Sequence, residues 1–149
     1  LFAMRGGFQM KFCRTYPAVL ESLDAISSDA EVFCESVGIG ADTAFALNLC
    51  LEEIFTNCAT YGCGLSPDEK IEISLEPRGG CVLAEISDSA APFDPLTQAP
   101  APDTAAGADE RKIGGLGVFL VKKYAEKVEY RRENGKNILS IYIKNPAKK

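Results

Sequence analysis

Apolar residues recur every three or four positions in two neighbouring segments, which is the spacing of one face of an α-helix. The first stripe predicts an amphipathic helix that has Pro17 in its first turn and ends at Gly38. It comprises Val19, Leu23, Ile26, Ala30, Phe33 and Val37. The second predicts a helix over residues 40–61, and its stripe is Leu47, Leu51, Ile54, Phe55 and Cys58.

Elsewhere the pattern alternates with a period of two, which is typical of strands. Residues 8–14 suit an edge strand, and 71–75 with 81–87 form a hairpin around the Gly pair that follows Arg78. After GGLG we expect a helix through Ala125, then two strands joined by a tight turn at Asn134 and Gly135. This order predicts an α+β fold, with a mixed or antiparallel sheet and helices on one face.

Composition bounds the domain organisation and the class of protein. With 149 residues, 46% of them hydrophobic, the chain suits one domain, which we place at 10–149. Residues 1–9 are expected to be a native leader or a cloning remnant. The segment 95–113 is rich in Pro, Ala and Gly and has no periodicity, which predicts a functional lid or a disordered stretch.

Charge and apolar run lengths exclude two kinds of binding surface. The net charge is −5, and the one basic run, around Lys122 and Lys123, is broken by acids, so we expect no direct nucleic-acid binding. No apolar run is long enough to span a bilayer, so we expect a soluble, cytoplasmic protein that does not bind a membrane.

The cysteines and the missing histidine narrow the chemistry further. The six cysteines include no C-x-x-C pair, and the chain has no His, so histidine-dependent mechanisms are excluded and a zinc site is disfavoured. We interpret the cysteines as small buried hydrophobic residues in a reducing compartment.

The segment LEEIFTNCATYG (51–62) carries polar residues on an otherwise apolar helix. Glu53 and Asn57 are four residues apart, so they share one helix face, off the apolar stripe. A carboxylate and an amide so placed could hold a hydrated Mg²⁺ and a water or hydroxyl beside it. A solvated helix face explains the same residues, and the segment taken alone favours that interpretation.

Two further segments each allow a binding role and a plain structural one. In ISDSAAPFDP (86–95) a strand ends at Asp88, which could accept a hydrogen bond from an adenine amine, or could simply end a strand in a turn. In IGGLGVFLVKK (113–123) glycines precede a helix, where free backbone amides could bind phosphate or where the chain could hinge.

Together, and in this order, the three segments resemble the nucleotide-binding boxes of the GHKL ATPase superfamily. The nearest likeness is to the anti-sigma-factor serine/threonine kinases of the RsbW and SpoIIAB type, and it extends over nearly the whole chain from Met10. Its most specific part is the hairpin EYRRENGKN (129–137), which comes after GGLG in the chain. The resemblance implies a Bergerat ATP-binding fold, a two-layer α/β sandwich with a mixed, mostly antiparallel sheet.

The resemblance also implies roles for single residues. Glu53 would be the catalytic base, and Asn57 would ligate magnesium. Asp88 would bind the adenine amine, with Ala90 beside the base. Gly115 and Gly117 would contact the phosphates, and Ser140 would lie near the adenine. The cofactors would be ATP and Mg²⁺.

This sequence departs from the family at one position that bears on ATP. The family's Asp-x-Gly is here Asp88-Ser89-Ala90. If the third position required a positive φ, alanine would be strained and ATP affinity would fall.

The family activity is transfer of the ATP γ-phosphate to a Ser or Thr of an anti-anti-sigma (STAS) protein. The resemblance further implies a sigma factor as second partner and a homodimer. The alternative is a catalytically weak, ATP-responsive partner-switching protein. The ATP-binding part of a histidine kinase is disfavoured, since no helix bearing a phosphoacceptor His precedes the domain.

Overall fold

Two helices form where the apolar spacing predicts them. The computed structural model describes residues 2–5, 9–98 and 115–146. Helix α1 spans Leu23–Val37 after a short 3-10 turn at Leu20–Ser22, and it ends at Gly38, which has a left-handed φ of 72°. Helix α2 spans Ala41–Asn57 and continues into a π-helical turn, Cys58–Gly62. A left-handed residue closes a helix at least cost when it is glycine, which explains the predicted stop at Gly38.

The first helix starts later than predicted. Pro17 is the last residue of strand β2 and pairs with Lys70, and its carbonyl accepts a hydrogen bond from Ser22 Oγ at 2.7 Å. Proline lacks an N–H, so it ends a strand as readily as it begins a helix, and the apolar spacing alone could not decide between the two.

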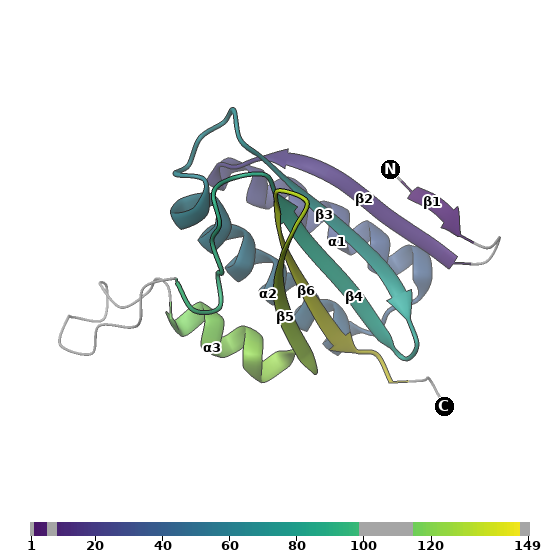
Figure 1. Cartoon of the computed structure of the whole chain (residues 1–149). Helices are drawn as coiled ribbons and strands as arrows, with labels where there is room; N and C mark the ends of the chain where they lie inside the picture. The colour runs from purple at the N-terminus through teal and green to yellow at the C-terminus, as the bar shows by residue number, and fades with distance from the viewer. Residues whose placement is uncertain (1, 6–8, 99–114, 147–149) are drawn as a thin grey trace.

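Six strands form one sheet (Figure 1). They are β1 (Phe2–Arg5), β2 (Gln9–Pro17), β3 (Lys70–Arg78), β4 (Cys81–Asp88), β5 (Lys127–Glu133) and β6 (Lys136–Lys144), in the order β1-β2-β3-β4-β6-β5. Every neighbouring pair is antiparallel. The α+β fold is therefore confirmed, and the sheet formed by the described strands is antiparallel and not mixed. β2 is not an edge strand as predicted, because residues 2–5, assigned to the leader, form β1 beside it.

The two predicted hairpin turns are present. Gly79 and Gly80 join β3 to β4 with φ of 53° and 81°, and Asn134 and Gly135 join β5 to β6 with φ of 52° and 77°. Two consecutive positive φ values match the twist of an antiparallel hairpin, and Gly and Asn tolerate them best. These turns set the register of the strands that carry the candidate site.

One face of the sheet packs against the helices. Residues Ile71, Ile73, Ile86, Leu139 and Ile141 of the inner strands are at most 2% exposed and join α1 and α2 in one core. In Figure 1, α1 and α2 lie behind the strands. Helix α3 (Gly115–Tyr124) packs on α2. Side chains alternate along a strand, so the remaining strand residues face away from the helices.

Two compositional expectations can be compared with the structure. All six cysteines are free, but only Cys34, Cys50 and Cys58 are buried; Cys13 is exposed, and Cys63 and Cys81 are half-buried. Three of the six therefore do not fit the interpretation as buried hydrophobic residues. Among the described residues, no helix is long and apolar enough to cross a membrane.

Candidate functional site

The C-terminal half of α2 brings Glu53 and Asn57 to one face, as their spacing predicts. Asn57 is 2% exposed, so the alternative of a solvated face is wrong for this residue, whereas Glu52 is exposed. The amide nitrogen Nδ2 of Asn57 is buried and has no hydrogen-bond partner among the described residues. A buried polar group without a partner costs about 1–3 kcal/mol, so an amide kept there suits a ligand that the protein alone does not supply.

Glu53 lies against the start of α3. A Cβ added at Gly117 would overlap Glu53 Oε2, so with the carboxyl in this position the backbone of α3 at Gly117 lies directly against it. Gly115 is the first residue of α3, and Gly117 is buried in its first turn. The structure thus places the predicted base beside Gly117, one of the two predicted phosphate-binding glycines.

The Glu53 carboxyl is suited to accept a proton. Burial raises its pKa above the ordinary value for glutamate, and the neighbouring charge of Glu52 raises it further. A carboxylate with a raised pKa holds a proton more firmly than a solvated one, which favours general-base chemistry near neutral pH.

Asp88 ends β4 in a buried position and is held by a side chain that was not among the predicted site residues. It is 6% exposed, and its Oδ1 accepts hydrogen bonds from Asn137 Nδ2 at 2.8 Å and from the backbone N–H of Ala90 at 3.1 Å. No described residue donates to Oδ2. One carboxylate oxygen is therefore fixed by the protein, and the other is left for a ligand.

Asn137 connects Asp88 to the segment that follows it. Its Oδ1 accepts hydrogen bonds from the Phe93 backbone N–H at 3.0 Å and from the Tyr130 hydroxyl, and its Nδ2 also donates to the Ala91 carbonyl at 3.0 Å. Asp88 and Asn137 are directly opposite each other in the β4–β6 register. The turn at Asn134 and Gly135 fixes the pairing of β5 with β6, but β4 and β6 are distant in the sequence, so no local sequence signal identified Asn137 as the partner of Asp88.

Ala90 is accommodated without backbone strain. Its φ is not positive, since the only described non-glycine residues with positive φ are Leu65 and Asn134. The condition under which alanine would impair this position is therefore not met. The segment is also anchored at Phe93, which packs against Gly62 at the end of the π-helical turn.

Ser140 is the predicted site residue that the structure keeps apart from the others. It is buried on β6 opposite Glu85, donates to Glu85 Oε2 at 2.7 Å and accepts from Arg131 at 3.0 Å. Asp88 is three residues from Glu85 on β4, so the two point to opposite faces of the sheet. The β4–β6 register therefore places the side chain of Ser140 on the face away from the helices, so its predicted place near the adenine does not agree with Asp88 as the residue that binds the adenine amine.

Cys58 and Cys63, at the two ends of the π-helical turn after α2, are poor nucleophiles. Burial raises the pKa of Cys58 well above the ordinary thiol value, and burial together with the charge of Asp88 raises that of Cys63 to about 11. Both thiols stay protonated near neutral pH, so thiolate chemistry does not compete with the carboxylates here.

The side chains at this site suit magnesium better than a metal that is ligated by three or more protein side chains. Among the described residues no group of three or more His, Cys, Asp or Glu side chains could hold a metal. Magnesium keeps several waters and is commonly held by one or two protein oxygens together with substrate phosphates, so the single buried amide of Asn57 fits it. Most of the predicted lid, 95–113, lies outside the described residues.

This chain is similar to known proteins in its sequence and in its fold. The serine/threonine-protein kinase BtrW of Bordetella bronchiseptica is 28% identical over 119 residues, which cover 77% of this chain and 83% of that protein. The crystal structure of the RsbU and RsbW domains of Rv1364c from Mycobacterium tuberculosis is similar over 91% of this chain, with a TM-score of 0.59 and 9% identity. This chain spans about a third, 32%, of that solved chain, and at such low identity the likeness shows the fold alone.

A family model also matches most of the chain. Residues 16–143 match the histidine kinase-like ATPase domain, a range that includes α1, α2, α3, β3, β4, β5 and nearly all of β6. The predicted Bergerat fold and the GHKL resemblance are confirmed by this match and by the structural likeness. The chain therefore belongs to the histidine kinase-like ATPase domain family.

Proposed function

We propose that this chain is an ATP-dependent serine/threonine protein kinase of the anti-sigma regulatory type, acting on an anti-anti-sigma (STAS) protein. The observation that carries the proposal is the contact between Glu53 and the Gly117 turn of α3, one helical turn from the unpartnered amide of Asn57. It sets a potential base beside a potential phosphate site. A sigma factor as second partner and a homodimer are parts of the same proposal that rest on the family resemblance.

Adenine recognition is assigned to Asp88. Its Oδ1 is occupied by Asn137 and the Ala90 amide, so Oδ2 is the atom that would accept a hydrogen bond from the exocyclic amine. An ionised carboxylate only accepts hydrogen bonds, so it discriminates against guanine, which presents a carbonyl oxygen at that position.

Phosphate binding is assigned to the start of α3 and to Asn57. Backbone amides at a helix N-terminus and the positive end of its dipole favour anions, and the glycines at 115 and 117 leave no side chain in the way. The Asn57 amide has one oxygen that would ligate magnesium and N–H groups that would donate to phosphate. Bound magnesium would neutralise charge on the phosphates.

The transfer step needs little covalent chemistry from the protein. The hydroxyl oxygen of the partner's Ser or Thr attacks the γ-phosphorus, the bond from that phosphorus to the bridging oxygen breaks, and ADP leaves. Glu53 accepts the hydroxyl proton. Such reactions depend mostly on positioning and charge stabilisation, which a rigid helix pair supplies.

An ATP-responsive switch without phosphoryl transfer is the second candidate. Exposed Glu52 and half-buried Glu53 are neighbours, and Glu53 could order water between helices without acting as a base. Both candidates bind ATP, so only transfer of phosphate separates them.

Glu53→Gln tests the assigned base while preserving shape. Incubation with γ-labelled ATP and the cognate STAS protein should label the wild type's partner, and the variant should label it about 100-fold more slowly, since general-base catalysis contributes at least that much. Glu52→Gln, an isosteric change at the exposed neighbour, should retain most of the rate near neutral pH. A stable complex that never labels the partner would support the switch instead.

The pH dependence of transfer reports the Glu53 carboxylate. Activity should rise with pH through the raised pKa of Glu53, because only the ionised form accepts a proton. Glu52→Gln removes the like charge that helps to raise that pKa, so the midpoint of this rise should move to lower pH. Single-turnover rates across pH measure it, and an unmoved or upward-shifted midpoint would refute the electrostatic coupling.

Asn57→Ala should separate stability from function. Removing an unsatisfied buried amide relieves a cost of about 1–3 kcal/mol, which offsets the lost packing, so the free energy of unfolding should not fall appreciably. Magnesium-dependent ATP binding, followed by calorimetry, should be lost. Unchanged ATP affinity in a folded variant would remove Asn57 from the proposed site.

Asp88→Asn should reduce the preference for adenine. The substituted amide can turn a donor toward the adenine amine, and loss of a hydrogen bond to a charged group weakens binding by about tenfold or more. Ser140→Ala is the matched control, since Ser140 faces the other side of the sheet, and its ATP affinity should equal that of the wild type. Equal binding of ATP and GTP by the wild type would show that Asp88 does not read the base.

A further inference from the structure

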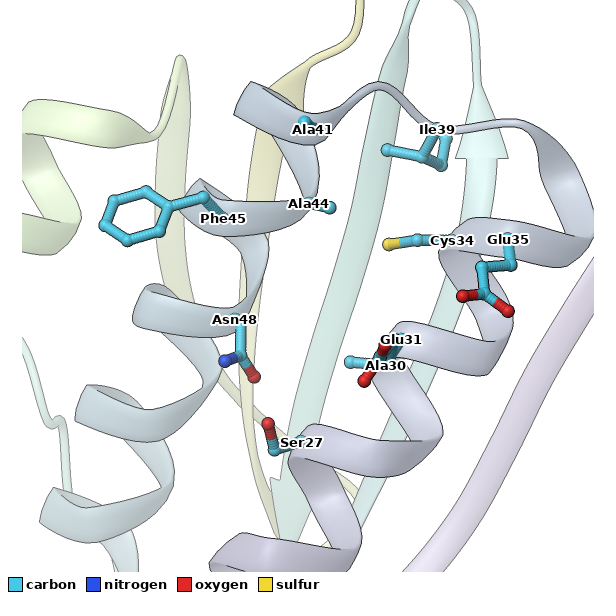
Figure 2. A pocket seen from close by; sticks show the side chains of 10 residues that line it. All are labelled: Ser27, Ala30, Glu31, Cys34, Glu35, Ile39, Ala41, Ala44, Phe45 and Asn48. Atoms are coloured by element: carbon cyan, nitrogen blue, oxygen red, sulfur yellow. The ribbon is translucent and has the colours of Figure 1, made fainter.

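A groove runs between α1 and α2 on the side away from the sheet. Its larger part is a cavity of about 440 Å³. Figure 2 shows the strands passing behind the two helices, and the side chains of Ala30, Cys34 and Ala44 on the facing sides of the groove. Small side chains at these positions leave the space open where two packed helices would usually interdigitate.

The groove continues along the helices. A second hollow of about 130 Å³ shares Ser27 and Asn48 with the first and extends to Asp24 and Glu52. The groove thus reaches the neighbour of Glu53.

The groove carries acidic residues and no basic ones. Glu31 and Glu35 line the larger cavity from α1, one helical turn apart and both exposed, and Asp24 and Glu52 line the smaller one. None of these four forms an ion pair with another described residue; the one acid of α1 that does, Asp29, pairs with Arg14 at 2.7 Å.

This charge asymmetry extends beyond the groove. The sequence from Thr15 to Glu69 contains no Lys or Arg, although the whole chain has 16 of them. Helices α1 and α2 therefore carry no basic side chain, and Lys122 and Lys123 of the neighbouring α3 do not line the groove, so the groove itself has a negative potential that favours a partner of the opposite sign.

We propose that the α1–α2 groove is the docking site for a basic amphipathic helix of a protein partner. Its apolar stripe would lie against Ala30, Cys34 and Ala44, and Lys or Arg side chains one turn apart would meet Glu31 and Glu35. A helix laid in a groove with apolar anchors and charged flanks is a recurrent mode of peptide recognition. The proposal does not rest on kinase activity, because it concerns a surface separate from the ATP site.

The test uses the full chain, without nucleotide, and a fluorescent 15-residue peptide as long as α1. The peptide has Leu at helical spacing with Lys on both flanks, and it is compared with a scrambled peptide of the same composition. Anisotropy should show that the amphipathic peptide binds more tightly than the scrambled one. Equal binding of the two peptides would overturn the proposal, since net charge alone would then explain it.

Two groove variants locate the binding. Glu31→Lys with Glu35→Lys should weaken binding of the amphipathic peptide about tenfold, since both changes are exposed and reverse the charge at the rim. Ala44→Leu, which fills the groove without changing charge, should also weaken it. Wild-type affinity in either variant would overturn the proposal, with circular dichroism confirming that each is folded.

A charge-matched control distinguishes binding in the groove from attraction by the net negative charge of the whole protein. Asp68→Lys with Glu72→Lys makes the same change in net charge at two exposed residues that do not line the groove, and it should leave the Kd within about twofold at physiological salt. An equal loss in this control would contradict groove recognition. Light scattering measures whether the chain self-associates. If the wild type is a dimer and the double variant Glu31→Lys with Glu35→Lys is a monomer, a second copy of the chain occupies the groove, and the proposal is wrong.

Discussion

The hydrogen bond from Asn137 to Asp88 organises the end of the sheet on which the candidate site depends. It joins the last residue of β4 to the start of β6 in register, and the same amide holds the segment from Ala90 to Phe93 through backbone groups. Phe93 in turn packs on Gly62, the last residue of the π-helical turn that follows α2. One buried side chain thus fixes the orientation of the Asp88 carboxylate and the position of the chain that leaves it. Because buried polar groups are costly unless satisfied, this network rigidifies the site only when complete, and here each polar group of Asn137 has a described partner.

The second constraint is the close approach of α3 to α2 at Gly117. It costs the carboxyl of Glu53 part of its hydration, and that desolvation is the main cause of its raised pKa. The nearby amide of Asn57 is buried without a partner for its nitrogen. The protein therefore stores unfavourable electrostatic free energy in two neighbouring groups on α2. Such groups are tolerated where a ligand relieves the cost, which is why the least satisfied part of the core is also the part to which we assign phosphate chemistry.

Local patterns predicted most of the secondary structure, because the helices, both hairpin turns and the Gly38 stop depend on spacing or on φ preferences within a few residues. The sequence also grouped Glu53 with Asn57, since four residues make one helical turn. It did not predict what non-local register decides. Asn137 meets Asp88, and Ser140 faces away, only because β4 and β6 pair as they do. The burial of Asn57 likewise follows from the packing around the end of α2, and the place of Pro17 in β2 from its pairing with Lys70. The absence of Lys and Arg from residues 15–69 is visible in the sequence. The groove lined by these acidic residues is not, because it forms only where α1 and α2 pack together.

A structure of the full chain with magnesium and a non-hydrolysable ATP analogue tests the central claim most directly. The account predicts the exocyclic amine of adenine within hydrogen-bond distance of Asp88 Oδ2, the amide oxygen of Asn57 on the metal, and the γ-phosphate between the start of α3 and Glu53. Asn137 should keep its hydrogen bond to Oδ1 of Asp88. A base bound away from Asp88, or phosphates remote from the Gly115 and Gly117 turn, would contradict it.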